Sequence, residues 1–567
     1  MQDTQDIIIG IDLGTTTTEA AIYRNGKAEV IPSFDGRPAI PSAVGIDDSG
    51  NFVVGEKAKA QYILAPERTA IEIKRKIGTK GDIQLGNKKY TAVELSAKIL
   101  EYVKRYAEDY LQAPVNRAVI SVPAYFDDIQ RRETADAGRL AGFTVERIIN
   151  EPTAAALSYG INHLEEESHI LVYDLGGGTF DVTVLELFEG VLEVKASSGD
   201  NRLGGKDFDQ RLINWLTNLF EEKCGVSIKE DVFAGSRLKE AAEQCKIALS
   251  TQDEFRVQLP MLAKKDQKPL ALDEIVTREQ LEALIRDDLT RTHGPIQTAL
   301  ADSNMRAEDL DLVLLAGGST RIPLVARDVK DLLGREPSGD IHPDYSIAEG
   351  AAIQAGIISG AITEEDSMIV TDVNPYTLGI RVFDGWTADR MSVVVPRNVT
   401  IPVTKHSIYY TSFDSQTEAS IEVYQGDRRT ATKNHLIGSF TIGGIPPAPA
   451  GDEQIDVSFA YNLNGILDVS ATVVSTGEAA SVSIGMTDTP TDEQVDVSSW
   501  KQSPIAGDYR ALIRRGEKAA RTARKAGDED YASRLEDVIY ELKYEILHEN
   551  PDEAEELEDE LRDLLEY

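Results

Sequence analysis

Ile170-Leu-Val-Tyr-Asp-Leu-Gly-Gly-Gly-Thr-Phe-Asp181 opens as a short apolar run, which predicts a strand buried on both faces. The run reaches Asp174 and breaks into three glycines, residues 176–178. Because glycine lacks a Cβ, backbone built from it turns sharply and brings its N–H groups against a phosphate. Thr179 adds a hydroxyl, and Asp174 and Asp181 add carboxylates suited to a hydrated Mg²⁺ or a water nucleophile. A tight turn between two antiparallel strands is the alternative, and this stretch alone favours neither.

The same pattern occurs near the start of the chain, in Ile7-Ile-Ile-Gly-Ile-Asp-Leu-Gly-Thr-Thr-Thr17. Two copies of strand, Asp, Leu, Gly and Thr predict an internally duplicated α/β domain. The two hairpins are expected to face each other and to clamp a triphosphate from both sides. A third element, Leu312-Val-Leu-Leu-Ala-Gly-Gly-Ser-Thr-Arg321, again runs a buried strand into glycines. This repetition favours phosphate binding over chance turns.

Six motifs, in order along the chain, resemble the signatures of the DnaK-type seventy-kilodalton heat-shock chaperones. They are Ile11-Asp-Leu-Gly-Thr-Thr16, Val122-Pro-Ala-Tyr-Phe126, Asn150-Glu-Pro-Thr-Ala-Ala-Ala156, residues 174–181, Leu203-Gly-Gly-Lys-Asp-Phe-Asp209 and residues 317–323. The resemblance implies a multidomain protein. Its implied parts are an actin-like (duplicated, ribonuclease H-like) α/β ATPase domain over residues 1–365, a linker over residues 366–373, an antiparallel β-sandwich that binds peptide over residues 374–490 and a shortened α-helical lid over residues 491–567.

This resemblance implies an ATP-dependent molecular chaperone that binds and releases extended hydrophobic segments of unfolded proteins. Hydrolysis of ATP to ADP and phosphate is expected to be slow and to be coupled allosterically to peptide affinity. The implied partners are unfolded polypeptide clients, a J-domain co-chaperone and a nucleotide exchange factor. The implied cofactors are ATP or ADP, Mg²⁺ and K⁺.

The resemblance also assigns site residues. Catalytic roles fall to Lys74, Glu151, Asp174, Thr179 and Asp181. Nucleotide contacts fall to Asp12, Gly14, Thr15, Thr16, Thr17, Gly176, Gly177, Gly178, Gly204, Gly205, Lys206, Glu243, Lys246, Ser250, Gly317, Gly318, Ser319, Arg321 and Asp344. Asp12, Asp174 and Asp181 are expected to hold Mg²⁺ mainly through water, with K⁺ near Asp12 and Asp181. These motifs contain no strong general base, so the expected hydrolysis depends on electrostatics and positioned water.

Several of these residues have plainer interpretations. Lys74 lies among alternating apolar positions, where a lysine is ordinarily a surface side chain with a buried stem. Residues 237–250 predict a helix that places Glu243, Lys246 and Ser250 on one face, where an ordinary surface pair of Glu and Lys is the alternative. Lys206 stands where the resembled family usually has an acidic residue. A cation near the phosphates would tighten nucleotide binding or slow product release.

A second set of residues resembles the family's route of communication between domains: Pro123, Arg131, Arg147 and Asp372. By resemblance, Pro123 and Arg131 report the nucleotide state, Arg147 is engaged by J-domain co-chaperones, and Asp372 is a linker acid that signals between domains. A proline that merely ends a strand is an equally consistent interpretation of Pro123.

The segment Met368-Ile-Val370 has two interpretations as well. It predicts either a first strand of the next domain or, by resemblance, a hydrophobic linker that docks on the nucleotide domain when ATP is bound. Thr371 interrupts the usual run of leucines, so weaker docking is expected.

Residues 376–486 are rich in Val, Ile, Thr and Ser and contain regularly spaced turns, which predicts an antiparallel β-sandwich. The resemblance places peptide contacts at Leu378, Ile380, Val382, Phe383, Tyr410, Phe413, Ala419 and Ile421. Burial in a sandwich core is the favoured alternative for Leu378 and Ile421 taken singly. Phe383 and Phe413 are bulkier, and Ala419 smaller, than the family's usual residues, which predicts an altered side-chain preference.

Residues 499–567 predict helices, with an apolar stripe that includes Leu535, Val538, Ile539, Leu542 and Ile546. By resemblance these are lid helices, and short ones. The abbreviated lid and the linker sequence resemble the specialised bacterial HscC branch of the family, and such a lid is expected to release peptide faster.

Bulk composition limits the remaining possibilities. The 567 residues exceed one core and predict two to four domains. A formal net charge of −37 argues against nucleic acid and anionic membrane surfaces as partners. Only Cys224 and Cys245 are present, too few for a disulfide framework, and no signal peptide or membrane-spanning run is found. A reducing, cytoplasmic setting is expected.

Two other function classes remain open. A small-molecule kinase on the same fold would need a base beside a sugar-sized cleft, and it would leave the β-rich segment without a role. An exchange factor or scaffold with an inactive ATPase is disfavoured by the intact Lys74, Glu151, Asp174 and Thr179.

Overall fold

The computed structural model describes residues 7–79, 81–266, 268–363, 367–383, 389–483, 500, 503, 505–526, 535, 538–540, 542–543, 545–546 and 551–566. The chain forms two compact units. The first comprises Met1–Gly379, Val393–Val423 and Gly438–Met486, and the second comprises Ile380–Ser392, Tyr424–Ile437 and Thr487–Tyr567. Both units take strands from the predicted sandwich segment. The predicted boundaries near residues 365 and 490 lie outside the described residues, and the domain limits stay predictions.

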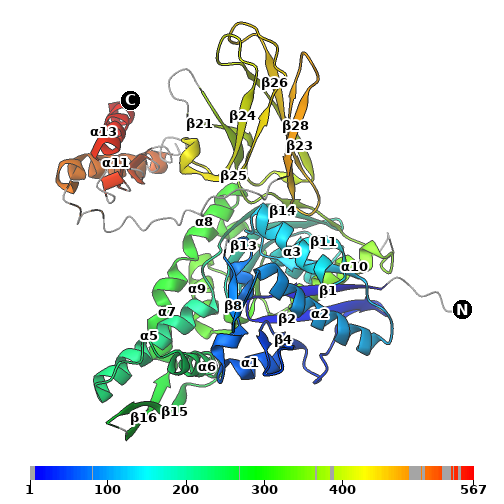
Figure 1. The fold of residues 1–567 in the computed structure, drawn as a ribbon, viewed down its shortest axis with the longest axis vertical. Helices are drawn as coiled ribbons and strands as arrows, with labels where there is room; N and C mark the ends of the chain where they lie inside the picture. The colour runs from blue at the N-terminus through cyan, green and yellow to red at the C-terminus, as the bar shows by residue number, and fades with distance from the viewer. Residues whose placement is uncertain are drawn as a thin grey trace, which may run out of the picture. The chain divides into compact units, whose positions relative to one another are not determined.

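The first unit contains two larger sheets, one of six strands and one of five, whose central strands are arranged alike (Figure 1). In the first sheet the order is β11-β10-β1-β2-β3, with β4 paired to β2. The strands are β1 Ile8–Leu13, β2 Thr17–Arg24, β3 Lys27–Val30, β4 Ala39–Pro41, β10 Arg117–Val122 and β11 Thr144–Asn150. β1 pairs antiparallel with β2 and parallel with β10.

The second sheet repeats this arrangement in the order β17-β12-β13-β14-β18. Its strands are β12 Ser168–Leu175, β13 Phe180–Phe188, β14 Val191–Asp200, β17 Leu312–Ala316 and β18 Ile369–Val370. β12 pairs antiparallel with β13 and parallel with β17. In each sheet the first strand of a hairpin ends in Asp-Leu directly before a glycine, and it has one antiparallel and one parallel neighbour, as the predicted duplication requires.

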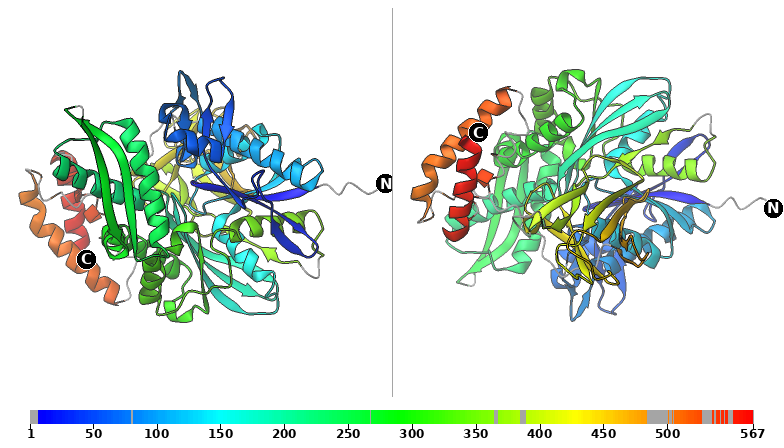
Figure 2. Two further views of the ribbon diagram at one scale, coloured as in Figure 1. Left: turned by 90° about the horizontal axis from the view of Figure 1, so that it is seen from below. Right: turned by 90° about the horizontal axis from the view of Figure 1, so that it is seen from above.

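Helices connect the strands of both sheets. They are α1 Glu56–Tyr62, α2 Ala92–Leu111, α3 Asp128–Leu140, α4 Glu151–Gly160, α5 Gly205–Cys224, α6 Val232–Leu249, α7 Arg278–Thr290, α8 His293–Asp302, α9 Pro323–Leu333 and α10 Ser346–Ile358. A long hairpin of β15 Glu254–Lys265 and β16 Lys268–Thr277 extends alongside α6 and α7 (Figure 2). Short strands β5 Val44–Ile46, β6 Phe52–Val54, β7 Thr69–Ala70, β8 Ile83–Leu85 and β9 Lys88–Tyr90 complete this part.

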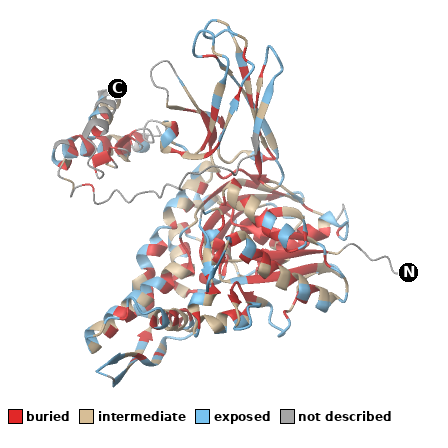
Figure 3. Cartoon of the chain, viewed as in Figure 1, coloured by how far each residue is buried: buried red, intermediate tan, exposed pale blue. Residues whose placement is uncertain are grey.

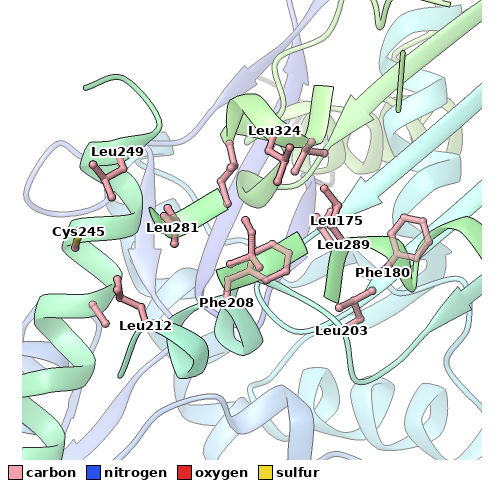
Figure 4. Packing of buried hydrophobic residues seen from close by; sticks show 14 of the residues in the cluster. Leu175, Phe180, Leu203, Phe208, Leu212, Cys245, Leu249, Leu281, Leu289 and Leu324 are labelled. Carbon is pink, nitrogen blue, oxygen red and sulfur yellow. The ribbon is translucent and has the colours of Figure 1, made fainter. Parts of the chain in front are cut away.

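Buried residues concentrate in the central strands of the two sheets (Figure 3). From Ile170 onward β12 is buried throughout, which confirms the predicted strand covered on both faces. One cluster joins Leu175 and Phe180, on either side of the glycine turn, to Phe208 of α5 and Cys245 of α6 (Figure 4). Cys224 and Cys245 are both free thiols.

Helix α10 crosses α4 without room for a side chain at Gly350. A Cβ built there would lie 1.8 Å from the Ala154 carbonyl oxygen. Alanine ordinarily stabilises a helix relative to glycine by about 1 kcal/mol, but the clash with backbone outweighs that gain. We expect Gly350→Ala to lower the free energy of unfolding by about 3 kcal/mol in thermal or urea melts. Gly339→Ala, where nothing lies within 4 Å, is the control, and equal effects of the two variants would contradict this packing.

Two four-stranded sheets follow the two larger sheets along the sequence. One has the order β23-β26-β27-β28, and all three pairings are antiparallel. The other has the order β21-β20-β24-β25. The strands are β20 Leu378–Val382, β21 Arg390–Val395, β23 Val403–Tyr410, β24 Ala419–Gln425, β25 His435–Ile442, β26 Gln454–Tyr461, β27 Leu467–Val473 and β28 Ala479–Ser483. The predicted turn at residues 463–466 connects β26 to β27, with Gly465 at φ 66°.

The described part of the C-terminal segment contains the helices α11 Ala506–Ala526 and α13 Pro551–Glu566. The apolar residues predicted to form a stripe are buried in one cluster with both helices: Leu535, Val538, Ile539, Leu542 and Ile546. Within the described residues, no helix combines the length and apolar character needed to span a bilayer.

Candidate functional site

The two glycine turns lie against each other. A Cβ on Gly177 would come within 2.2 Å of the Thr16 hydroxyl oxygen, and one on Gly178 within 2.8 Å of the Thr15 hydroxyl oxygen. The threonine turn between β1 and β2 therefore faces the glycine turn between β12 and β13. Such an approach requires glycine, and it leaves backbone N–H groups and hydroxyls beside a shared space.

Two further glycine segments close in on the second turn. Gly205 N–H donates to the Gly176 carbonyl at 3.0 Å, and Lys206 N–H donates to the Gly177 carbonyl at 2.9 Å. The Ser319 hydroxyl donates to the Gly176 carbonyl at 2.8 Å. Gly317 has a φ of 81°, and a Cβ there would lie 2.7 Å from the Asp174 carboxylate. The predicted residues Gly176, Gly177, Gly178, Gly204, Gly205, Gly317, Gly318 and Ser319 thus form one region.

A buried ammonium lies among four buried carboxylates next to these turns. Lys74, carried by the short helix η2 Ile73–Lys76, forms an ion pair with Glu151 at the start of α4. Burial alone would lower the pKa of Lys74, but the carboxylates of Glu151, Asp12 and Asp174 raise it overall. Asp181 completes the set and accepts a hydrogen bond from Tyr125 N–H at 2.9 Å. The surface-lysine interpretation of Lys74 is therefore wrong.

Burial raises the pKa of the carboxyl groups in this cluster. It raises the pKa of Asp12 and of Asp174, and the neighbouring Glu151 and Asp181 raise the pKa of Asp174 further. Burial also raises the pKa of Asp181 to about 6 and that of Glu151 to about 7. So much negative charge in one buried place favours the arrival of a cation.

The donor set fits a water-ligated hard cation. One oxygen each of Asp174 and Asp181, Oδ2 in both, is buried and has no hydrogen-bond partner among the described residues. Asp12 Oδ1 accepts a hydrogen bond from the Ser121 hydroxyl at 2.8 Å. No three His, Cys, Asp or Glu side chains of the described chain are placed as a direct ligand group. These oxygens suit Mg²⁺, which keeps several of its waters in such sites.

A cavity of about 40 Å³ lies beside the facing turns. Its lining comes from two sides of the domain: Thr15, Thr16, Pro41, Ser42, Ala43, Lys59, Tyr62, Ile71 and Glu72 on one, and Lys206, Lys239, Glu240 and Glu243 on the other. Glu243 and Lys246 are buried, so the surface-pair alternative for this face of α6 is wrong. Lys246 lies 2.8 Å from Asp209 and donates to the Gly205 carbonyl.

The ammonium of Lys206 is paired with two carboxylates. It lies 2.7 Å from Glu243 Oε1 and 3.5 Å from Asp209, and its role as a nucleotide contact stays a prediction. The buried carboxylate on the adjacent helix attracts it, because an unpaired charge there would be costly. Ser250, at the end of α6, donates its hydroxyl to the Lys246 carbonyl. Arg321 pairs with Asp344 at 2.7 Å, so these two predicted residues also meet.

The residues predicted to communicate between domains also come together. Arg131 is buried and donates to Asn150 Oδ1 at 2.7 Å and to the Ala124 carbonyl at 2.9 Å, next to Pro123. Burial raises the pKa of Asp372, and the facing Arg131 and Arg147 oppose this rise. Asp372 therefore lies where cations of α3 and β11 converge.

The linker segment is a strand of the second sheet. Ile369 and Val370 pair in parallel with Val191 and Leu192 of β14, and Thr371 N–H donates to the Leu192 carbonyl at 3.1 Å. The segment pairs with β14 of the second sheet, so its interpretation as a first strand of the next domain is wrong, and docking in response to ATP stays a prediction. The backbone makes these bonds, which explains why Thr371 does not prevent the pairing.

Helix α3 contacts the loop and strand that follow β26. Asp128 accepts a hydrogen bond from Leu467 N–H at 2.6 Å, and Arg132 donates to the Leu467 carbonyl at 2.6 Å. Asn464 accepts a hydrogen bond from Ile148 N–H at 3.0 Å. These contacts join α3 and β11 to the β26–β27 connection within the first compact unit.

Asp128 supplies a pH-dependent prediction. Burial raises its pKa to about 6, opposed by Arg132 and Leu467 N–H. The folded protein therefore binds this proton more tightly than the unfolded chain, whose aspartates titrate near ~3.9. The stabilisation is fully present below the unfolded value and is lost as pH rises through about 6.

We therefore expect the wild type to gain at most about 3 kcal/mol of unfolding free energy relative to Asp128→Asn between about pH 7 and about pH 4. Parallel denaturation of both proteins across this range measures it. Identical pH dependence of the two proteins would contradict the burial of an ionisable group at this contact.

The predicted peptide residues divide by exposure. Leu378, Ile380 and Ile421 are buried, as the core alternative for Leu378 and Ile421 predicts. Val382 and Ala419 are partly buried. Phe383, Tyr410 and Phe413 are 53%, 55% and 67% exposed, so these aromatic side chains are the accessible members of the set.

Three residues around the facing turns and the cavity were not predicted from the sequence. Ser42 donates its hydroxyl to the Gly14 carbonyl at 2.7 Å, Lys59 pairs with Glu243 at 2.8 Å, and Arg75 pairs with Asp207 at 2.6 Å while donating to the Gly178 carbonyl. Arg75 could have been predicted, because it directly follows Lys74 in the sequence. Ser42 and Lys59 belong to no sequence motif that would have indicated them.

Comparison with known proteins gives one consistent result. A family model described as Hsp70 protein matches residues 8–84 and 79–566. The Chaperone protein DnaK of Thermotoga petrophila is 44% identical over 559 residues, which cover 96% of this chain and 93% of that protein. The Chaperone protein DnaK of Thermosipho africanus is 42% identical over 567 residues, which cover 100% of this chain and 93% of that protein.

Proposed function

Because the chain belongs to the Hsp70 family and is therefore an ATP-hydrolysing molecular chaperone, we propose that its facing threonine and glycine turns bind the phosphates of ATP and that this occupancy sets its affinity for extended polypeptide. The observation that carries the proposal is the direct approach of Thr15 and Thr16 to Gly177 and Gly178, beside the buried Lys74.

In this proposal the phosphates lie against N–H groups of the two turns, with the hydroxyls of Thr15, Thr16, Thr17 and Thr179 beside them. The Lys74 ammonium offsets charge that develops as the terminal phosphoryl group leaves, and its pair with Glu151 holds it in place. Glu151 and Asp181, with pKa values of about 7 and about 6, orient the attacking water. Asp12, Asp174 and Asp181 would hold hydrated Mg²⁺, which supplies charge neutralisation across the phosphates, and K⁺ is proposed near Asp12 and Asp181.

Glu243, Lys246 and Ser250 are proposed to contact the ribose and adenine, with Arg321 and Asp344 forming the opposite wall. Their arrangement supports this, because Glu243 lines the cavity that adjoins the facing turns. Gly204, Gly205 and Gly14 have no room for a Cβ, which would meet Gly178 N, Ser319 Oγ and the Thr17 carbonyl oxygen, so glycine allows the close packing of the segments proposed to face the nucleotide.

Communication with the β-rich segment is proposed to pass through Pro123, Arg131, Arg147 and Asp372 and through the paired linker. ATP would favour the docked state and hydrolysis would release it, which is a population shift between two states. Phe383, Tyr410 and Phe413, which are exposed, are proposed peptide contacts, and so are the partly buried Val382 and Ala419. The partners proposed are unfolded clients, a J-domain co-chaperone near Arg147 and a nucleotide exchange factor, and the setting proposed is the cytoplasm.

Phosphate release measured with and without an unfolded peptide and a J-domain protein tests this function. Stimulation by both is the expected result. Sugar-dependent formation of ADP would instead indicate a small-molecule kinase, and absence of any turnover would indicate a scaffold.

A further inference from the structure

Glu243 is held by two ammonium groups at once. Its Oε1 lies 2.7 Å from Lys206, and its Oε2 lies 2.8 Å from Lys59. The side chains of Glu243 and Lys206 are only 8% and 9% exposed, whereas that of Lys59 is 32% exposed. Burial favours the neutral carboxyl, but the two ammoniums overcome it and lower the pKa of Glu243 to about 2. Glu243 is therefore an ionised hydrogen-bond acceptor at any physiological pH.

The two lysines differ in origin. Lys206 lies in the first turn of α5, which packs against α6, the helix that carries Glu243. This pair is local to one wall of the cavity. Lys59 comes from α1 on the other wall, so its pair with Glu243 spans the cavity. Lys59, Lys206 and Glu243 all line the cavity, but only the Lys59 pair joins its two walls, whereas the Lys206 pair joins two residues of the same wall.

We propose that Lys206 is a positioning residue for the ribose hydroxyls, acting through Glu243; this rests on the proposed role of Glu243 as a ribose contact. Lys206 binds Oε1 and so fixes the carboxylate with Oε2 directed across the cavity. The ribose hydroxyls then share or replace the Lys59 contact at Oε2. When the ribose replaces Lys59, the Lys206 ammonium stays paired with the buried Glu243 carboxylate, which avoids the cost of an isolated buried charge.

A direct phosphate contact by Lys206 is the competing role. The geometry disfavours it, because the ammonium is already engaged by Glu243 and Asp209. The main chain of Lys206, not its side chain, meets the glycine turn, through its N–H bond to Gly177.

Affinities of the full chain for ADP and for 2′,3′-dideoxy-ADP separate these roles. Lys206→Met keeps the apolar stem and removes the charge. We expect it to weaken ADP binding by about tenfold and to change dideoxy-ADP binding by less than about twofold. Lys206→Arg should restore ADP affinity. Equal weakening of both ligands, or no change in either, would overturn the proposal.

Lys223→Met is the matched control. Lys223 lies near the other end of α5 and pairs with Glu274 at 2.5 Å on the surface, so its removal should leave both affinities unchanged. If the wild type binds both ligands equally, Glu243 does not contact the ribose and the inference fails with it. If the wild type binds no ADP, the proposed function itself fails.

Discussion

Lys74→Ala is expected to lower the rate of ATP hydrolysis by about 10²- to 10³-fold while ATP still binds. The ammonium of Lys74 is buried and is placed among Glu151, Asp12 and Asp174, where no other cation is paired with Glu151 within the described residues. Its removal takes away the positive charge that would oppose charge developing on the terminal phosphoryl group. The proposed phosphate contacts of the two turns would remain, because backbone and hydroxyl groups of other residues would make them.

Single-turnover hydrolysis of prebound ATP measures this effect, with an equilibrium titration of ATP as its companion. Lys76→Ala is the matched control, since Lys76 lies in the same short helix η2 but is exposed. We expect the control to hydrolyse ATP like the wild type. A Lys74→Ala protein that hydrolyses ATP at the rate of the Lys76→Ala protein would contradict the proposed chemistry.

Arg132→Ala is expected to slow ATP-triggered release of bound peptide by at least about tenfold without changing ATP affinity. Arg132 donates to the Leu467 carbonyl at 2.6 Å and lies 3.2 Å from Asp468, and it also holds Asp128 at 2.8 Å. Its removal takes away two contacts to β27 and leaves Asp128 without its cation. The docked state then loses stability, so ATP shifts the population less effectively.

Stopped-flow fluorescence of a labelled unfolded peptide, mixed with ATP, measures the release. Arg139→Ala is the control, because Arg139 is on the same helix but is 61% exposed and forms its ion pair with Asp136 of α3 itself. If Arg132→Ala released peptide at the wild-type rate, the contacts between α3 and β27 would not be needed for ATP to trigger release.

Local sequence was sufficient for the parts of the fold that depend on short-range chemistry. The apolar run before Asp174 and the three glycines after it predicted β12 and its turn, and the repeat at Asp12 predicted the second hairpin. The i, i+3 spacing of Glu243 and Lys246 placed them on one face of α6. These features follow from backbone conformation and helix periodicity, which neighbouring residues determine.

Long-range pairing was beyond such reasoning. Lys59 and Glu243 are 184 residues apart, and nothing near either residue specifies the other. For the same reason the motif around Lys206 did not predict that its ammonium pairs with Glu243, a buried carboxylate on the neighbouring helix. The burial of Ile380 beside the exposed Phe383 depends likewise on how strands from distant segments assemble.

We propose that nucleotide bound between the two facing turns governs the affinity of the chain for extended polypeptide. The most direct measurement is the dissociation rate of a labelled unfolded peptide from the full chain, saturated in turn with Mg·ATP and with Mg·ADP. We expect the peptide to dissociate at least about tenfold faster with Mg·ATP than with Mg·ADP. Equal rates with the two nucleotides would contradict it.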